Sequence, residues 1–125
     1  FENWRAPFKP WIRGGRTVKP LTGDEDVFGD GTVTMLAMPG HTPGHFVLLV
    51  RLEHAAPVLL SGDLAHFREN YEDNGVPPTW GFNRADSLAS LDRFKRIAAN
   101  VRATVVIQHD ARDIPKVPAF PAAAE

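Results

Sequence analysis

Residues 39–45 read Pro-Gly-His-Thr-Pro-Gly-His and separate two apolar runs, at residues 32–38 and 46–52. Both runs are rich in aliphatic and β-branched side chains, a composition that favours β-strands. The two Pro-Gly steps favour turns, and glycine lets the backbone pass close to a ligand where a Cβ would obstruct it. We therefore predict two strands joined by a stiff loop that carries His41 and His45.

Two further apolar runs, at residues 57–63 and 104–108, each end at a polar side chain. Short apolar runs without alternation are typical of strands that are buried on both faces. The first run ends in Ser-Gly-Asp and the second is followed by His109. We expect both strands to deliver a metal-competent group, Asp63 or His109, at a strand end.

The rest of the chain predicts loops and one long helix. Residues 1–31 are irregular, and residues 64–79 favour a short helix followed by a loop. Asn83 is a typical N-cap for the long helix. Residues at helical spacing then predict one apolar stripe, made of Leu88, Leu91, Phe94 or Lys95, Ala98 and Val101. Three prolines predict a coil for the tail, Pro115, Pro118 and Pro121.

Composition excludes several classes of function. The chain has 125 residues, of which 43% are hydrophobic, and we treat residues 1–125 as a single unit. The net charge of -1 comes without a block of like charge, which argues against a nucleic-acid or anionic-membrane partner. No apolar run approaches the roughly 20 residues that span a bilayer. Because cysteine is absent, any metal site must use His, Asp or Glu.

His41, Asp63 and His109 are the candidate metal ligands, because each follows a predicted strand. The spacing of His41 and His45 also matches half of a zinc finger, but the proline between them prevents the required helix and no cysteines complete the set. Spacing alone leaves open a structural turn in which both histidines only form hydrogen bonds.

The order of PGHTPGH at 39–45, SGD at 61–63 and QHD at 108–110 resembles the metallo-β-lactamase superfamily. The resemblance implies an α+β fold, the C-terminal part of an αβ/βα four-layer sandwich. It also implies two divalent metal ions, with zinc expected and cobalt, manganese or iron also compatible with nitrogen and oxygen ligands. His41 would bind one ion, Asp63 would bridge both, His109 would bind the second, and His45 would orient the loop or a ligand without binding metal.

Over residues 18–114 the sequence is most similar to the N-acyl homoserine lactonase branch of that superfamily. This implies a quorum-quenching hydrolase that opens a lactone ring. Where such lactonases commonly have a tyrosine that touches the substrate carbonyl, this chain has His66, which is expected to be catalytic and substrate-binding; the alternative is a surface histidine. The backbone of Gly81 is expected to meet the substrate amide.

Other functions remain open on the sequence: a glyoxalase II-like thioesterase, an organophosphate or aryl esterase, or a non-catalytic fragment. The superfamily's HxHxDH motif is absent from these residues. We therefore expect that a missing N-terminal half of the same protein completes the site and that this chain alone is inactive. The expected partner is a small-molecule lactone or ester. A homodimer is compatible with the sequence, and a cytoplasmic location is favoured over a periplasmic or secreted one.

Several other polar and aromatic residues receive no catalytic role. We expect Asp110 to be the first polar residue of a loop rather than a support for a ligand. The acidic run after Asp63 is typical of a solvated face, and large aromatic residues more often pack in a core than line a ligand pocket. These residues are Glu69, Glu72 and Asp73, and Trp4, Trp11 and Trp80.

Overall fold

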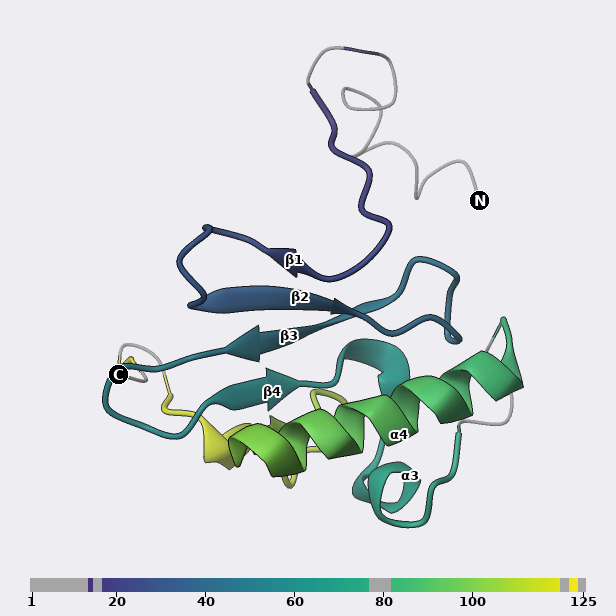
Figure 1. Cartoon of the computed structure of the whole chain (residues 1–125). Helices are drawn as coiled ribbons and strands as arrows, with labels where there is room; N and C mark the ends of the chain where they lie inside the picture. Colours follow the sequence, from purple (N-terminus) through teal and green to yellow (C-terminus); the bar gives the residue numbers. More distant parts are fainter. Residues whose placement is uncertain (1–13, 15–16, 77–81, 120–121, 124–125) are drawn as a thin grey trace.

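The computed structural model describes residues 14, 17–76, 82–119 and 122–123, and these form one open five-stranded sheet with helices (Figure 1). The strands follow the chain in the order β1-β2-β3-β4-β5. Neighbouring strands are antiparallel except for β4 and β5, which are parallel. Their bounds are β1 Glu25–Asp26, β2 Val33–Ala37, β3 Phe46–Val50, β4 Val58–Leu60 and β5 Thr104–Val106.

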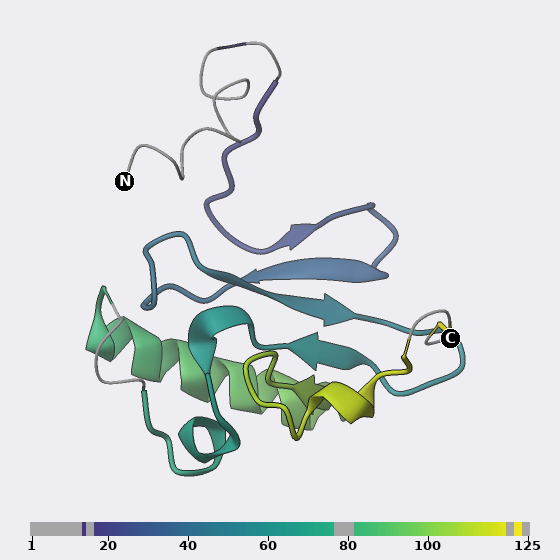
Figure 2. The ribbon, with the colours of Figure 1, turned by 180° about the vertical axis from the view of Figure 1, so that it is seen from behind.

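Helix α4, Arg84–Val101, lies across one face of the sheet and leads into β5. Between β4 and α4 come the 3₁₀ turn η2, Gly62–Leu64, and the short helix α3, Arg68–Glu72. A last 3₁₀ turn, η3, Ile114–Lys116, lies beside β5 (Figure 2). Among the described residues, no helix combines the length and apolar character needed to cross a membrane.

Three strands end at the same edge of the sheet. β3 is antiparallel to both β2 and β4, and β5 is parallel to β4, so β2, β4 and β5 all run in one direction. The loop at residues 39–45, the turn η2 and the segment after β5 therefore leave the sheet at one end. The topology brings together the segments that carry the candidate ligands.

The core lies between the sheet and α4. Side chains alternate between the two faces of a strand, and one face buries its residues against the helix. This cluster contains Leu36, Met38, Val47, Leu49 and Leu59 from the sheet side with Leu91, Phe94 and Ala98 from α4. Full burial of such a side chain stabilises a fold by about 1.5–3 kcal/mol. The opposite face is also apolar but only half-buried, at Val33, Met35, Phe46, Leu48, Val50 and Leu60.

Helix α4 begins as predicted, because the Asn83 side chain accepts hydrogen bonds from the N–H groups of Ala85 and Asp86. The predicted apolar stripe is wrong at Leu88, which is 38% exposed. Ser87 and Ser90 are buried instead. The first turns of α4 contact a backbone loop rather than the sheet.

The contacts of the two serines explain why they are buried and Leu88 is exposed. Ser90 Oγ donates a 2.6 Å hydrogen bond to the Pro39 carbonyl. Gly40 has φ +137°, and a Cβ at this position would lie 2.4 Å from the backbone nitrogen of Ser87. The loop at residues 39–45 and the first turn of α4 are therefore packed backbone to backbone.

The strands end earlier than the sequence predicts. β4 stops at Leu60, so Asp63 lies in η2 rather than at a strand tip, and β5 stops at Val106, before His109. The turn follows from Gly62, whose φ of +53° lies in the left-handed region that favours glycine. The predicted coil of the tail is wrong at Ile114–Lys116, where η3 forms with proline in its first turn, a position that proline tolerates.

Gly40→Ala should lower the free energy of unfolding by about 2 kcal/mol or more, because it combines a strained φ with a clash against backbone. Urea unfolding monitored by circular dichroism measures the change. Gly23→Ala is the matched control, since nothing lies within 4 Å of a Cβ there. Equal stability of the two variants would contradict the close packing of the loop on α4.

Candidate metal centre

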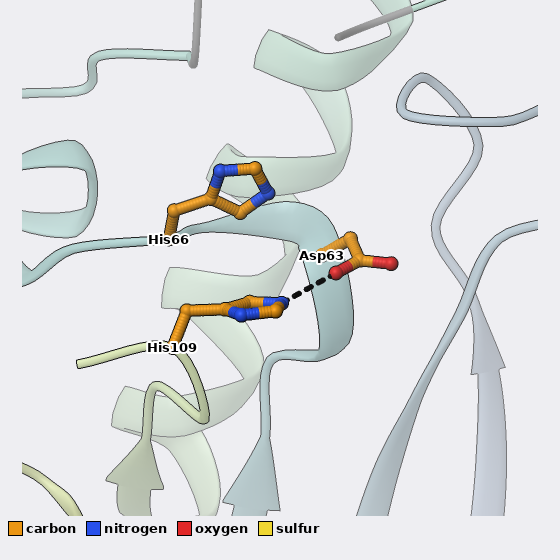
Figure 3. A group of neighbouring side chains, drawn as sticks. All are labelled: Asp63, His66 and His109. Carbon is orange, nitrogen blue, oxygen red and sulfur yellow. Dashed lines mark hydrogen bonds and ion pairs between the residues drawn. The ribbon is translucent and has the colours of Figure 1, made fainter. Parts of the chain in front are cut away.

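Four potential donors converge at the end of the sheet where β2, β4 and β5 stop. His41 comes from the loop between β2 and β3, Asp63 from η2, His66 from the segment after η2, and His109 from the segment after β5. Figure 3 shows the last three side chains pointing toward a common space. The structure thus brings together all three ligands predicted from the sequence, and adds His66.

The Asp63 carboxylate lies between two imidazoles. Its Oδ1 accepts a 2.6 Å hydrogen bond from His109 Nε2, and its Oδ2 lies 3.6 Å from His41 Nε2. Each oxygen therefore faces a different histidine. The hydrogen bond from His109, together with the charges of the nearby imidazoles, lowers the pKa of Asp63 below its usual value despite some burial. The carboxylate stays ionised at neutral pH.

His45 supports Asp63 and has no nitrogen left to bind a metal. Its Nδ1–H donates to the Met38 carbonyl at 3.0 Å, and its Nε2 accepts the Asp63 backbone N–H at 3.0 Å. Burial lowers the pKa of the imidazole, which favours the neutral form that these two bonds require. A Cβ on Gly62 would lie 2.8 Å from the same Nε2, so only glycine leaves room for the bond.

His66 groups with Asp63 and His109. One donor atom from each of these three residues lies within 4.8 Å of the other two. Among the described residues, this is the group of potential metal donors that lie close together. The ring centroids of His66 and His109 are 4.9 Å apart, whereas those of His66 and His41 are 6.0 Å apart. Burial, and next the charge of His109, lower the pKa of His66.

Asp110 lies in the loop after β5, as expected, but it is not a solvent-exposed loop residue. Asp110 is 4% exposed. Its carboxylate accepts the Arg68 backbone N–H, at the start of α3, and pairs with the Arg112 guanidinium. The hydrogen bonds from Arg112 hold the pKa of Asp110 far below its usual range. Glu69 is exposed, as expected, but forms two hydrogen bonds with the same guanidinium.

Asp113 is a supporting residue that the sequence did not indicate. It is fully buried, and it accepts hydrogen bonds from the Ile107 backbone N–H, Lys116 Nζ and Arg68 Nη2. Arg68 thus joins α3 to the segment after β5. Because His66 and His109 lie on these two segments, the ion pairs set the distance between them. No short motif would have revealed the link from Asp113 to α3, since Arg68 lies 45 residues away in sequence.

The residues present fit divalent metal ions. The Asp63 carboxylate supplies oxygen donors, and the imidazoles of His41 and His109 beside it supply nitrogen donors. This set suits zinc and also cobalt, manganese or iron. The predicted substrate contact Gly81 lies outside the described residues, as do Trp4, Trp11 and Trp80.

Comparison with known proteins identifies the family. The profile of the metallo-beta-lactamase superfamily matches residues 2–109, so the chain belongs to this superfamily. The sheet and α4 correspond to its fold: the chain superimposes on a solved N-acyl homoserine lactone hydrolase with a TM-score of 0.73 and 32% identity, over 83% of this chain and 40% of that protein. That structure holds N-hexanoyl-L-homoserine at its catalytic metal centre.

The related sequences are N-acyl homoserine lactonases. The chain is 41% identical to AttM of Rhizobium radiobacter over 87 residues, which cover 68% of the chain and 32% of AttM. It is 32% identical to AiiA of Bacillus thuringiensis subsp. kurstaki over 82% of the chain and 40% of AiiA. The chain therefore spans 32–40% of the length of these relatives.

His45→Phe should weaken metal binding about 10–100-fold, the usual cost of losing a group that orients a ligand. The change leaves the Asp63 N–H and the Met38 carbonyl without their partner. Isothermal titration with Zn²⁺ measures the affinity. His54→Phe, at an exposed histidine, is the control. Unchanged affinity in His45→Phe would show that this histidine does not hold Asp63 in place.

Asp113→Asn should destabilise the chain at neutral pH and do so less in acid. Burial would raise the pKa of Asp113, but hydrogen bonds from Lys116, Arg68 and the Ile107 N–H outweigh burial and lower it. A lowered pKa contributes stability that is present above the unfolded value, about 4, and is lost as pH falls through the folded value. Urea unfolding at pH 7 and pH 3 should show a stability gap between the two proteins that narrows at pH 3. A constant gap would contradict the ionised pairing.

Proposed function

We propose that this chain supplies half of a two-metal site in a hydrolase that opens the lactone ring of N-acyl homoserine lactones. The observation that carries the proposal is the placement of Asp63, with one carboxylate oxygen toward His41 and the other toward His109. A carboxylate that bridges two ions requires this arrangement. The lactonase names of the relatives support the choice of substrate.

In this proposal Asp63 bridges the two ions, His41 binds one and His109 binds the other. His45 keeps the bridging carboxylate in position because its Nε2 accepts the backbone N–H of Asp63. Zinc is the expected metal, with cobalt, manganese or iron as alternatives. When bound, two such ions lower the pKa of water and polarise the lactone carbonyl. The Gly81 backbone would orient the substrate amide. The substrate contact expected of His66 stays a prediction.

The other ligands would come from the part of the relatives that this chain does not span. The half-buried apolar face of the sheet, opposite α4, supports this arrangement because it offers a surface for a second layer. Its residues include Met35, Phe46 and Leu48. We propose that the N-terminal half of the same protein packs on this face.

The test compares Asp63→Ala with Glu72→Ala in the protein that joins this chain to its N-terminal half. Loss of the bridging carboxylate should reduce lactone hydrolysis by about 10³-fold or more, since metal stabilisation of the transition state is worth several kcal/mol. Glu72→Ala changes an exposed carboxylate and should retain activity and metal. Chromatography of opened N-hexanoyl homoserine lactone measures the rate.

Parallel assays on a thioester and a phosphotriester test the choice of substrate independently of the metal site. Faster turnover of either compound than of the lactone would contradict the lactonase proposal while leaving the metal site intact. Full activity of Asp63→Ala would contradict the site itself.

A further inference from the structure

His66 lies where the resemblance to lactonases implies a tyrosine, and it lies among potential metal donors. His66 follows Asp63 by three residues and lies just after η2, the turn that contains Asp63. In Figure 3 its imidazole lies over that of His109, and both rings lie beside the Asp63 carboxylate. The Asn70 side chain accepts the backbone N–H groups of His66 and Phe67, which fixes the backbone at the base of the imidazole.

We propose that His66 binds the same divalent ion as Asp63 and His109, so that this chain alone completes a two-histidine, one-aspartate site for one ion. The inference rests on the metal site of the proposed function and changes the role of His66 from substrate contact to ligand. His41 lies near the other carboxylate oxygen of Asp63, Oδ2, and belongs to the other ion.

The distances suit one ion. Donors bound to tetrahedral zinc at about 2.1 Å are separated by roughly 3.4 Å. The donor atoms of Asp63, His66 and His109 already lie within 4.8 Å of one another. Closing the remaining gap of roughly 1.4 Å requires only side-chain rotation. Within the described part of the chain, the His66 imidazole forms no hydrogen bond that this rotation would break.

The donor types fit as well. Three protein ligands with a fourth position open to water characterise catalytic zinc sites, and two histidines with one carboxylate form such a set. A neutral imidazole is a good zinc ligand, whereas the phenol of a tyrosine, with a pKa of about 10, is mostly protonated at neutral pH. Histidine in place of tyrosine therefore changes what this position can bind.

Zn²⁺ binding to the 125-residue chain, measured by competition with a chromophoric chelator, tests the proposal. The wild-type chain should bind one Zn²⁺. His66→Tyr, which introduces the residue that the resemblance implies at this position, and His66→Ala should each weaken binding by about 100-fold or more, because a lost ligand costs at least as much as a lost supporting group. His54→Ala is the control, since His54 is exposed.

A second readout does not depend on the variants. Zn²⁺ should move the ¹⁵N chemical shift of one ring nitrogen in both His66 and His109 and leave His54 unchanged. Circular dichroism checks that each variant is folded.

The outcomes separate the two proposals. If the His66 variants bind Zn²⁺ as tightly as the wild type while His109→Ala loses binding, His66 is not a ligand and the proposed two-metal site stands. If the wild-type chain alone binds no Zn²⁺, the inference about His66 fails, whereas the proposed two-metal site, which the N-terminal half completes, does not. If His109→Ala binds Zn²⁺ as tightly as the wild type, the inference and the proposed metal site fail together.

Discussion

The hydrogen bond from the Asp63 backbone N–H to His45 Nε2 joins the two loops on which the candidate site depends. It connects η2 to the loop at residues 39–45, and the other ring nitrogen of His45 anchors that loop to the Met38 carbonyl at the end of β2. Gly62 is required because any side chain there would occupy the space of the imidazole. One buried neutral histidine thus fixes the direction of the carboxylate that lies between His41 and His109.

A second set of hydrogen bonds and ion pairs supports the segments that carry His66 and His109. Asp110 and Asp113 are both buried, and Arg68 bonds to each of them, through its backbone N–H and its guanidinium respectively. This holds the start of α3 against the segment after β5, and with them the loops of His66 and His109. Donors held by such surrounding bonds keep their geometry without a metal, which is what a preorganised coordination site requires.

Local patterns in the sequence predicted much of this fold. The apolar runs, the Pro-Gly steps and the Asn83 cap correspond to β2, β3, β4, β5 and α4, because each depends on residues close together in the chain. The convergence of His41, Asp63 and His109 also followed from their places after strands. The sequence did not reveal the burial of Ser87 and Ser90 or the link from Asp113 to Arg68, because these depend on contacts between segments distant in sequence.

Both proposals require that this end of the sheet bind a divalent ion through Asp63. Anomalous X-ray diffraction at the zinc edge, from crystals of the chain grown with Zn²⁺, tests it most directly. We expect a strong peak within about 2.0–2.2 Å of an Asp63 oxygen and of His109 Nε2. Zinc found only at exposed positions such as His54, with the Asp63–His109 hydrogen bond unchanged, would contradict it.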